Sequence, residues 1–142
     1  MFYDELNLGD EFTSPSKTVN DAHFLFFAGL TGDHHPSHYD VEFGKQTRYG
    51  KPVAHGLLIS ALTALGASSI STRIDGFIFL EQGCRFLKAV VVGDTLHPSH
   101  QVAEKWQKAG KRFVRFKTTI KNQRGEAVLE GFHLYLVDEV GK

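Results

Sequence analysis

The stretch His55-Gly56-Leu57-Leu58-Ile59-Ser60-Ala61-Leu62-Thr63-Ala64-Leu65-Gly66-Ala67-Ser68-Ser69 decides the fold, because it is the best candidate for a long helix in the chain. Leu58, Leu62 and Leu65 recur at spacings of four and three residues, which is typical of one helix face. Many of the other positions carry alanine or glycine. Small residues nearly all round suit a helix enclosed by other elements, so we predict an enclosed helix over 55–69.

Four segments of the C-terminal half have the character of β-strands. They are Phe77–Ala89, Thr95–Trp106, Arg112–Asn122 and Ala127–Val137. Turns that each contain a glycine separate them. Because each strand follows the previous one after a turn, we predict an antiparallel meander.

The last two strands show the clearest alternation of apolar and polar residues. In the first of them, Val114, Phe116, Thr118 and Ile120 share a face. In the final strand Val128, Phe132, Leu134 and Leu136 share a face, which Glu130 interrupts. We predict that these two faces point into a core.

The N-terminal half supplies an extended segment near Glu11–Val19 and a short helix that Asn20 caps and Gly29 and Gly32 end. Residues 33–52 are predicted to form a structured loop with at most a turn around 39–45. One strand, helical material and four more strands make an antiparallel sheet of about five strands. With the helix against it, we predict an α+β hot-dog fold, a sheet wrapped around a central helix.

Length, charge and cysteine content limit the classes of protein to consider. The 142 residues fit one domain, spanning 1–142. Lys+Arg and Asp+Glu both number 16, which argues against binding to nucleic acid or anionic membranes. The lone Cys84 cannot form an intramolecular disulfide, the first residues lack signal-peptide features, and no apolar run approaches the roughly 20 residues that span a bilayer. We therefore expect a soluble, cytoplasmic protein.

An antiparallel sheet of this kind leaves unpaired edges and a second apolar surface to cover. Pairing between the edges of two copies would extend the sheet into one continuous sheet. We therefore expect a homodimer, or a higher homo-oligomer of dimers.

The segment Phe27-Ala28-Gly29-Leu30-Thr31-Gly32-Asp33-His34-His35-Pro36-Ser37-His38-Tyr39-Asp40 holds the first candidate chemistry. Asp33 and His38 stand five residues apart around Pro36, so in a loop they can converge. A carboxylate and an imidazole together can hold a water molecule and handle both of its protons. Hydration of a double bond needs both proton transfers.

The segment Pro52-Val53-Ala54-His55-Gly56-Leu57-Leu58 holds the second candidate feature. A helix that begins with glycine presents free backbone N–H groups at the positive end of its dipole. Such groups can stabilise an enolate-like oxygen, which makes Gly56 a candidate site residue.

Together these segments resemble the signature of the MaoC-like hot-dog dehydratases and (R)-specific enoyl-CoA hydratases. That signature is usually Ser/Thr-Gly-Asp-x-Asn-Pro-x-His-x-Asp, an aromatic residue, and later Val/Ala-His-Gly-Met/Leu. Thr31-Gly32-Asp33, Pro36, His38, Asp40 and Phe43 match the first block, and Val53-Ala54-His55-Gly56-Leu57 matches the second. Arg85-Phe86-Leu87-Lys88-Ala89 and Val92-Gly93-Asp94-Thr95-Leu96 look like the strand and turn that follow the family's helix. The resemblance covers nearly the whole chain.

The resemblance implies a hydro-lyase that adds water to an acyl-CoA or acyl-carrier-protein thioester, or removes it, at a dimer interface and without a cofactor. In the family, the matching aspartate and histidine position the catalytic water, and the glycine offers its N–H to the thioester oxygen. Carried over, these catalytic residues are Asp33, His38 and Gly56. One departure is His35, which stands where the family usually has asparagine and can titrate near neutrality.

Several alternatives stay open at this point. The same fold could serve an acyl-CoA thioesterase, or a non-catalytic protein that binds acyl-CoA or stabilises a subunit. His55 suits a helix cap that bonds its own backbone as well as it suits a catalytic role. We expect no metal site, because Pro36 breaks any helix that would align His34 with His38 and no second ligand cluster appears.

Overall fold

A computed structural model describes residues 2–138 of the chain. Its strands are β1 (Glu11–Thr13), β2 (Lys17–Thr18), β3 (Phe77–Phe86), β4 (Thr95–Lys108), β5 (Lys111–Lys121) and β6 (Ala127–Val137). Its α-helices are α1 (Phe2–Glu5), α2 (Asp21–Thr31), α3 (Val41–Lys45) and α4 (Gly56–Ala61). Short 3₁₀ turns occupy Pro36–His38, Leu65–Ala67 and Ser71–Arg73.

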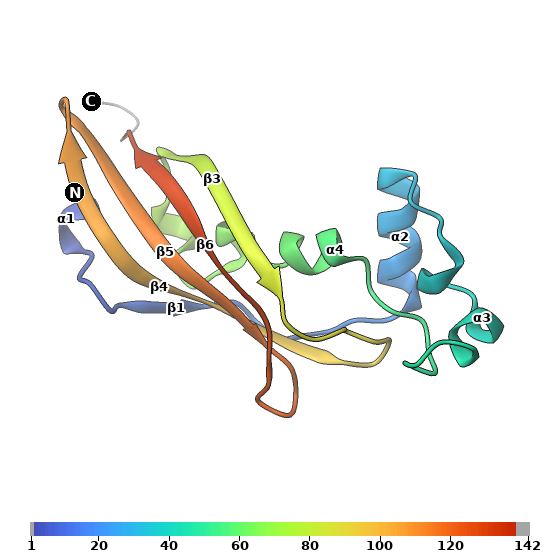
Figure 1. Ribbon diagram of the computed structural model, residues 1–142. Helices are drawn as coiled ribbons and strands as arrows, with labels where there is room; N and C mark the ends of the chain where they lie inside the picture. Colours follow the sequence, from blue (N-terminus) through green and yellow to red (C-terminus); the bar gives the residue numbers. More distant parts are fainter. Residues whose placement is uncertain (1, 139–142) are drawn as a thin grey trace.

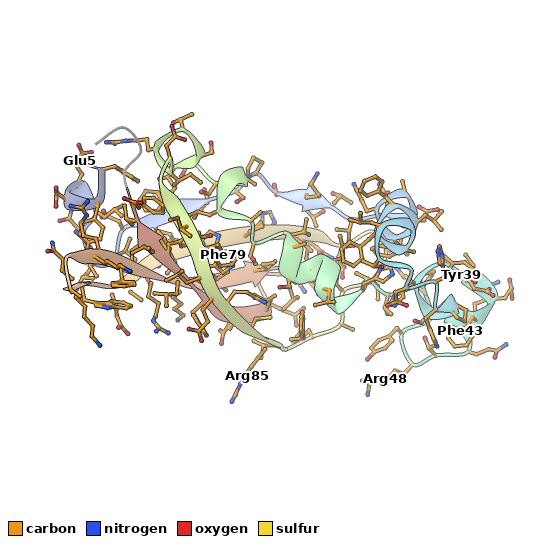
Figure 2. All side chains as sticks on the ribbon, turned by 90° about the horizontal axis from the view of Figure 1, so that it is seen from above. Glu5, Tyr39, Phe43, Arg48, Phe79 and Arg85 are labelled. Atoms are coloured by element: carbon orange, nitrogen blue, oxygen red, sulfur yellow. The ribbon has the colours of Figure 1, made fainter. Side chains whose placement is uncertain are left out.

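The strands form one antiparallel sheet in the order β1-β4-β5-β6-β3, with β2 also paired to β4. The sheet curves around α4, while α2 and α3 lie beyond one end of it (Figures 1 and 2). The predicted α+β hot-dog fold, with an antiparallel sheet of about five strands around a central helix, is confirmed.

The prediction of a four-strand meander is wrong for β3. Only β4, β5 and β6 follow one another across the sheet, whereas β3 pairs with β6 and forms the opposite edge from β1. The connection between β3 and β4 is too long for a tight hairpin. Its backbone instead pairs with the chain that leads into α4, through an isolated bridge between Val53 and Val91.

The inward face of β5 is as predicted, whereas that of β6 is as predicted only at Val128 and is reversed further along the strand. Val114, Phe116, Thr118 and Ile120 are all fully buried. On β6 Val128 is buried as predicted, together with Leu129, His133, Tyr135 and Val137. The predicted core residues Phe132, Leu134 and Leu136 are half-buried on the other face. Apolar alternation misled here, because the core-facing row contains a histidine and a tyrosine.

The central helix is shorter than predicted, since α4 ends at Ala61 instead of continuing to 69. Thr63 explains the early end. Its hydroxyl donates to the Ser60 carbonyl oxygen at 2.6 Å, and its own carbonyl oxygen accepts a hydrogen bond from Nε2 of His100 at 2.9 Å. That carbonyl is thus bonded to the sheet, and the chain continues as 3₁₀ turns.

Thr63 belongs to a buried polar network between the helix and the sheet. His133 Nε2 lies 2.9 Å from the Thr63 hydroxyl and can donate to it, and the Tyr135 hydroxyl can donate to His133 Nδ1 at 3.0 Å. The Thr118 hydroxyl lies 2.9 Å from the remaining nitrogen of His100. Every ring nitrogen is therefore satisfied with both histidines neutral.

Burial keeps this network uncharged near pH 7. Desolvation lowers the pKa of His133 to about 4, with a further contribution from nearby His100, and burial also lowers the pKa of His100. Burial raises the pKa of Tyr135 to about 12. Desolvation disfavours the charged form in each case.

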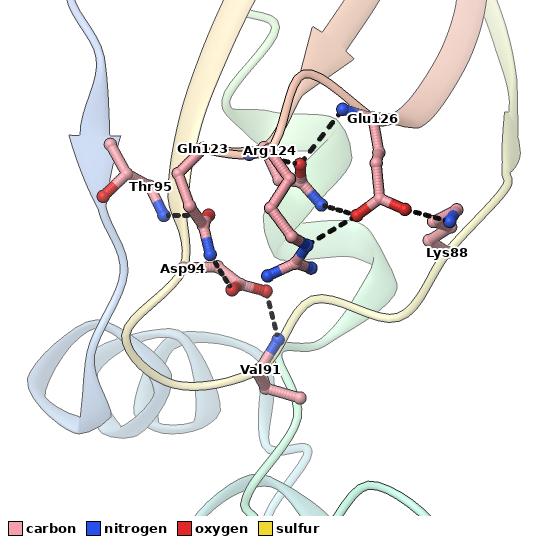
Figure 3. Close-up of polar contacts among 8 residues, drawn as sticks. Lys88, Val91, Asp94, Thr95, Gln123, Arg124 and Glu126 are labelled. Carbon is pink, nitrogen blue, oxygen red and sulfur yellow. Dashed lines mark hydrogen bonds and ion pairs between the residues drawn. The ribbon is translucent and has the colours of Figure 1, made fainter.

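A second polar network ties the β5–β6 turn to the loop before β4 (Figure 3). The Asp94 carboxylate accepts from the Val91 N–H at 3.0 Å and from the Gln123 amide at 2.8 Å. Glu126 pairs with Lys88 and Arg124, and these hydrogen bonds, that of Lys88 first, lower its pKa to about 2. Because Val91 bridges Val53, the network anchors the segment that leads into α4.

The pKa of His133 predicts a pH-dependent contribution to stability. An unfolded chain protonates this histidine below about pH 6.5, whereas the folded chain resists protonation until about pH 4. His133→Gln should lower the free energy of unfolding at pH 7 by about 1–3 kcal/mol, through lost hydrogen bonds. The difference in free energy of unfolding between parent and variant should shrink as the pH falls from 6.5 towards 4. In this range the unfolded parent chain binds a proton at His133 that its folded form does not, so only the parent loses stability through this group.

Urea unfolding followed by circular dichroism at several pH values checks this. His97→Gln is a matched control, since His97 is an exposed residue of β4. A deficit for His133→Gln that stays constant from pH 7 to pH 4 would contradict the assignment of a neutral, buried His133.

Candidate active site

The loop that carries Asp33 begins where α2 ends. Asn20 caps α2 as predicted, and the helix closes at Gly32, whose φ of 82° lies in the left-handed region that favours glycine. Gly29, also predicted to end the helix, lies inside it. The left-handed turn at Gly32 leads the chain directly into Asp33.

Asp33 and His38 face each other across the mouth of a cavity. The His35 N–H donates to Oδ1 of Asp33 at 3.2 Å, which leaves Oδ2 pointing to Nε2 of His38 at 3.7 Å. Their side chains are 54% and 14% exposed, respectively. A separation of 3.7 Å is too long for a direct hydrogen bond, and it suits two groups that share a third partner.

The orientation of His38 follows from a bond to the neighbouring segment. Its Nδ1 lies 2.8 Å from the carbonyl oxygen of Val53, and a carbonyl can only accept, so neutral His38 carries its proton on Nδ1. Nε2, which faces Asp33, is then an acceptor. The Val53 N–H in turn donates to the Ser37 carbonyl at 2.9 Å, so the loop and the segment are joined twice.

His55 lies directly beneath this pair. It is only 3% exposed, and its ring stacks on that of His38 with centroids 3.7 Å apart and planes 20° from parallel. Its Nε2 lies 3.0 Å from the carbonyl oxygen of Asp33, and Phe27 packs edge-on against it at 5.0 Å. His55 occupies the N-cap position of α4, but its side chain makes no cap hydrogen bond, so the expected bond to its own backbone is not formed.

Gly56 is the first residue of α4 and borders the same cavity. Among the described residues its N–H has no acceptor. The cavity has a volume of about 260 Å³, and its lining includes Phe27, Asp33, His38, Gly56, Leu57 and Phe86. The structure thus brings together all three residues that the sequence singled out. Asp33 and His38 form the acid–imidazole pair, and Gly56 lies at the start of the helix.

A second space lies along α4. It measures about 350 Å³ and shares Leu57 with the first. Ser60, Ala61 and Thr63 line it from the helix side, Phe79 and Gln82 from β3, and His133 from β6. Phe79, labelled in Figure 2, lies in the first half of β3.

The other residues of the first motif brace the loop. Asp40 caps α3 by accepting from the Phe43 N–H at 3.0 Å. His35, which stands where the signature that the sequence resembles usually has asparagine, accepts from the Ser37 N–H through Nδ1 at 3.2 Å. An imidazole can therefore replace the amide as a local acceptor.

Asp33, His38 and His55 place potential metal-ligating atoms within 4.8 Å of one another. The stacked rings argue against a shared ion. An imidazole binds a metal in its own plane, and two nearly parallel rings 3.7 Å apart direct their lone pairs alongside each other instead of to one point.

The fold and this site define a class of protein, the hot-dog proteins with an acid–imidazole pair beside a helix that starts with glycine. Residues 6–123 match the family model described as MaoC like domain. The chain therefore belongs to the MaoC-like dehydratase family.

Relatives with known names support the same family. The chain is 28% identical over 132 residues to the (R)-specific enoyl-CoA hydratase of Rhodospirillum rubrum, which covers 92% of this chain and 87% of that protein. It is 31% identical over 96 residues to Protein MaoC of Klebsiella aerogenes, covering 67% of this chain and 28% of that longer protein. An unliganded R-hydratase from Pseudomonas aeruginosa has a TM-score of 0.84 at 31% identity, covering 96% of this chain and 85% of that chain.

Within residues 2–138, none of the helices combines the length and apolar character that a membrane crossing requires.

Proposed function

We propose that this chain is an (R)-specific 2-enoyl-CoA hydratase, which in reverse acts as a 3-hydroxyacyl-CoA dehydratase, with Asp33, His38 and Gly56 as its catalytic residues. The observation that carries the proposal is the pair of acceptors, Asp33 Oδ2 and His38 Nε2, 3.7 Å apart on a cavity that Gly56 also borders. A relative that covers most of the chain bears the hydratase name.

The pair is suited to hold one water molecule. Both facing atoms are acceptors, so a water can donate one proton to each and present its oxygen lone pair to the substrate. In hydration the water oxygen bonds to C3 while one of the pair takes a proton. The electrons of the double bond move onto the thioester oxygen, and the proton is then returned to C2 as the thioester carbonyl re-forms.

Gly56 is suited to the charge that develops on the thioester oxygen. Its N–H is free of other partners among the described residues and lies on the cavity wall. A fixed donor aimed at a developing oxyanion stabilises the transition state more than the ground state. With α4 only six residues long, the individual N–H contributes more to this argument than the helix dipole does.

The space along α4 gives an acyl chain room to extend away from the reacting atoms. It is lined by residues of α4 and β3 and, like the catalytic cavity, by Leu57. The handle of the thioester, CoA or an acyl-carrier protein, then lies on the open side. Residues 1–142 act in this proposal as a single hot-dog domain, and the lone Cys84 suits a reducing compartment such as the cytoplasm.

Edge strand β3 supports the proposal of a homodimer. Ile78, Phe79 and Leu80 are each about half exposed on this strand, which has ten residues and, within residues 2–138, β6 as its only partner. A long, apolar, unpaired edge is a template for pairing with another strand. A second copy of β3, related by a two-fold axis, satisfies this edge and covers the space beside α4.

Removing either member of the acid–imidazole pair should abolish most of the hydration. For Asp33→Asn and His38→Gln we expect kcat for crotonyl-CoA to fall by about 10²–10⁴-fold, because the water loses one of its proton acceptors. Loss of enoyl absorbance measures hydration, and a thiol reagent measures free CoA in the same reaction. His34→Gln is the matched control, an exposed histidine next to Asp33.

Folded Asp33→Asn or His38→Gln that hydrates crotonyl-CoA at the parent rate would refute these roles. Release of CoA without loss of the enoyl bond would indicate a thioesterase. Binding of enoyl-CoAs of several lengths with no turnover would indicate a non-catalytic protein.

The Gly56 N–H can be removed with little disturbance of the backbone. Proline is tolerated at the first position of a helix, and His55 already has the φ of −59° and ψ of 135° that a residue before proline prefers. Gly56→Pro should therefore fold but lose about 10²–10³-fold in kcat. Gly56→Ala is the matched control, since it keeps the N–H and its Cβ would meet the Phe86 ring at an ordinary 3.5 Å. Equal activity of the two variants in the hydration assay would rule out the N–H as an oxyanion donor.

A charge on the β3 edge should dissociate the dimer. Ile78 lies on β3 but outside the linings of both cavities, so Ile78→Lys should convert the dimer to monomer through repulsion and the cost of burying the ammonium. Sedimentation or light scattering gives the mass. Leu8→Lys, at an exposed leucine before β1, should leave the dimer intact. A parent chain that is monomeric, or an Ile78→Lys variant that stays dimeric, contradicts pairing through β3.

A further inference from the structure

Among the residues that the structure describes, the His38 side chain makes a single hydrogen bond, from its Nδ1 to the Val53 carbonyl. One bond fixes where that nitrogen points but leaves the plane of the ring free to turn about the bond. The face of the ring is set instead by stacking on His55, at 3.7 Å and 20°. The other nearby ring, His35, meets His38 only edge-on at 6.2 Å.

His55 also acts on Asp33, by a separate contact. Its Nε2 donates to the Asp33 carbonyl oxygen at 3.0 Å, so the main chain of Asp33 is held at the point from which its carboxylate projects. Asp33 and His38 therefore share His55 as a neighbour. The ring face of His55 contacts His38, and its Nε2–H contacts the main chain of Asp33.

His55 is itself rigidly held. It is 3% exposed, Phe27 from α2 packs against its ring, and its backbone forms the start of α4 next to Gly56. It thus connects α2, the loop of Asp33 and His38, and the helix that carries the N–H donor. Groups that orient a catalytic residue in this way commonly affect the rate by 10–100-fold without touching the substrate.

We propose that His55 is a positioning residue, whose ring sets the plane of His38 and whose Nε2–H fixes the main chain of Asp33, so that both acceptors face the same point. The proposal rests on the hydratase function proposed above. His55 acts through its two neighbours and takes no proton from the substrate.

The two contacts can be separated by substitution. His55→Phe keeps a flat ring for stacking but has no donor, and His55→Gln keeps a donor but has no ring. His55→Ala has neither. We expect kcat for crotonyl-CoA to fall by about 10–100-fold in His55→Ala with KM changed less than about threefold, and to be partly restored in each of the other two variants. Val114→Ala, in the core cluster around Tyr3 and Phe116, controls for general destabilisation and should lower Tm with kcat unchanged.

A double-substitution cycle tests whether His55 acts through His38. If it does, His55→Ala added to His38→Gln should cost clearly less than His55→Ala costs in the parent chain, because only the contact with the Asp33 main chain is left to lose. A full second loss in the double variant overturns the proposal and makes His55 an independent participant. So does a His55→Ala variant that keeps the parent kcat, or one that loses activity only in proportion to Tm.

A spectroscopic measurement distinguishes failure of this proposal from failure of the hydratase function. In the parent chain, ¹⁵N–¹H correlation of histidine side chains should show His38 as the single Nδ1–H tautomer. His55→Ala should shift these signals and introduce exchange between tautomers. Unchanged His38 signals in His55→Ala overturn the positioning role, whereas a parent chain without hydration activity overturns the function and leaves this readout intact.

Discussion

Thr63 is bonded at once through its carbonyl to His100 on β4 and through its hydroxyl to His133 on β6, and the rest of the structure depends on this connection. It joins the end of the central helix to two strands in the middle of the sheet. Because the contacts are hydrogen bonds of defined geometry, they select one position of α4, whereas apolar packing alone tolerates sliding. The position of Gly56, at the other end of the same short helix, follows from it.

The opposite end of α4 is secured by backbone pairing. The Ala54 N–H donates to the Val90 carbonyl at 2.8 Å, and the loop around Val91 is braced by Asp94, Gln123 and Glu126 (Figure 3). The Val53 carbonyl that orients His38 belongs to this braced segment. The site is thus made by loops, but each loop is attached to the sheet within a few residues of a functional group, which limits the movement of the pair.

The sequence was informative where local chemistry alone determines the outcome. Asn20, Gly32 and the alternation along β5 predicted a helix and a strand correctly, because capping, a left-handed turn and burial of one face are local effects. The length of α4 was overestimated because the residues that end it, His100 and His133, are distant in the chain. His133 also misled the reading of β6, because it faces the core where Phe132, Leu134 and Leu136 do not.

For the site, the spacing of Asp33, His38 and Gly56 was sufficient to bring attention to the residues that share the cavity, but not to show how they are held. The stack of His55 on His38 joins residues separated by seventeen positions, and neither is unusual in its own segment. The signal that could have pointed to it is the pairing of two histidine-containing blocks. Of the two imidazoles in the site, that of His38 faces the cavity and suits a role in the reaction. That of His55 is buried and suits a role in orienting His38.

The openness of the site in one chain connects catalysis with assembly. Preorganised donors and acceptors are most effective where water is excluded, yet here the Asp33 side chain is 54% exposed and Leu57 and Phe86 on the cavity wall are also exposed. Leu57 belongs to α4, and Phe86 belongs to β3, the edge strand of the sheet. In the proposed dimer, pairing through β3 places the second copy over the open side of the cavity. The same apolar edge that stabilises the dimer then also excludes water from the reaction site.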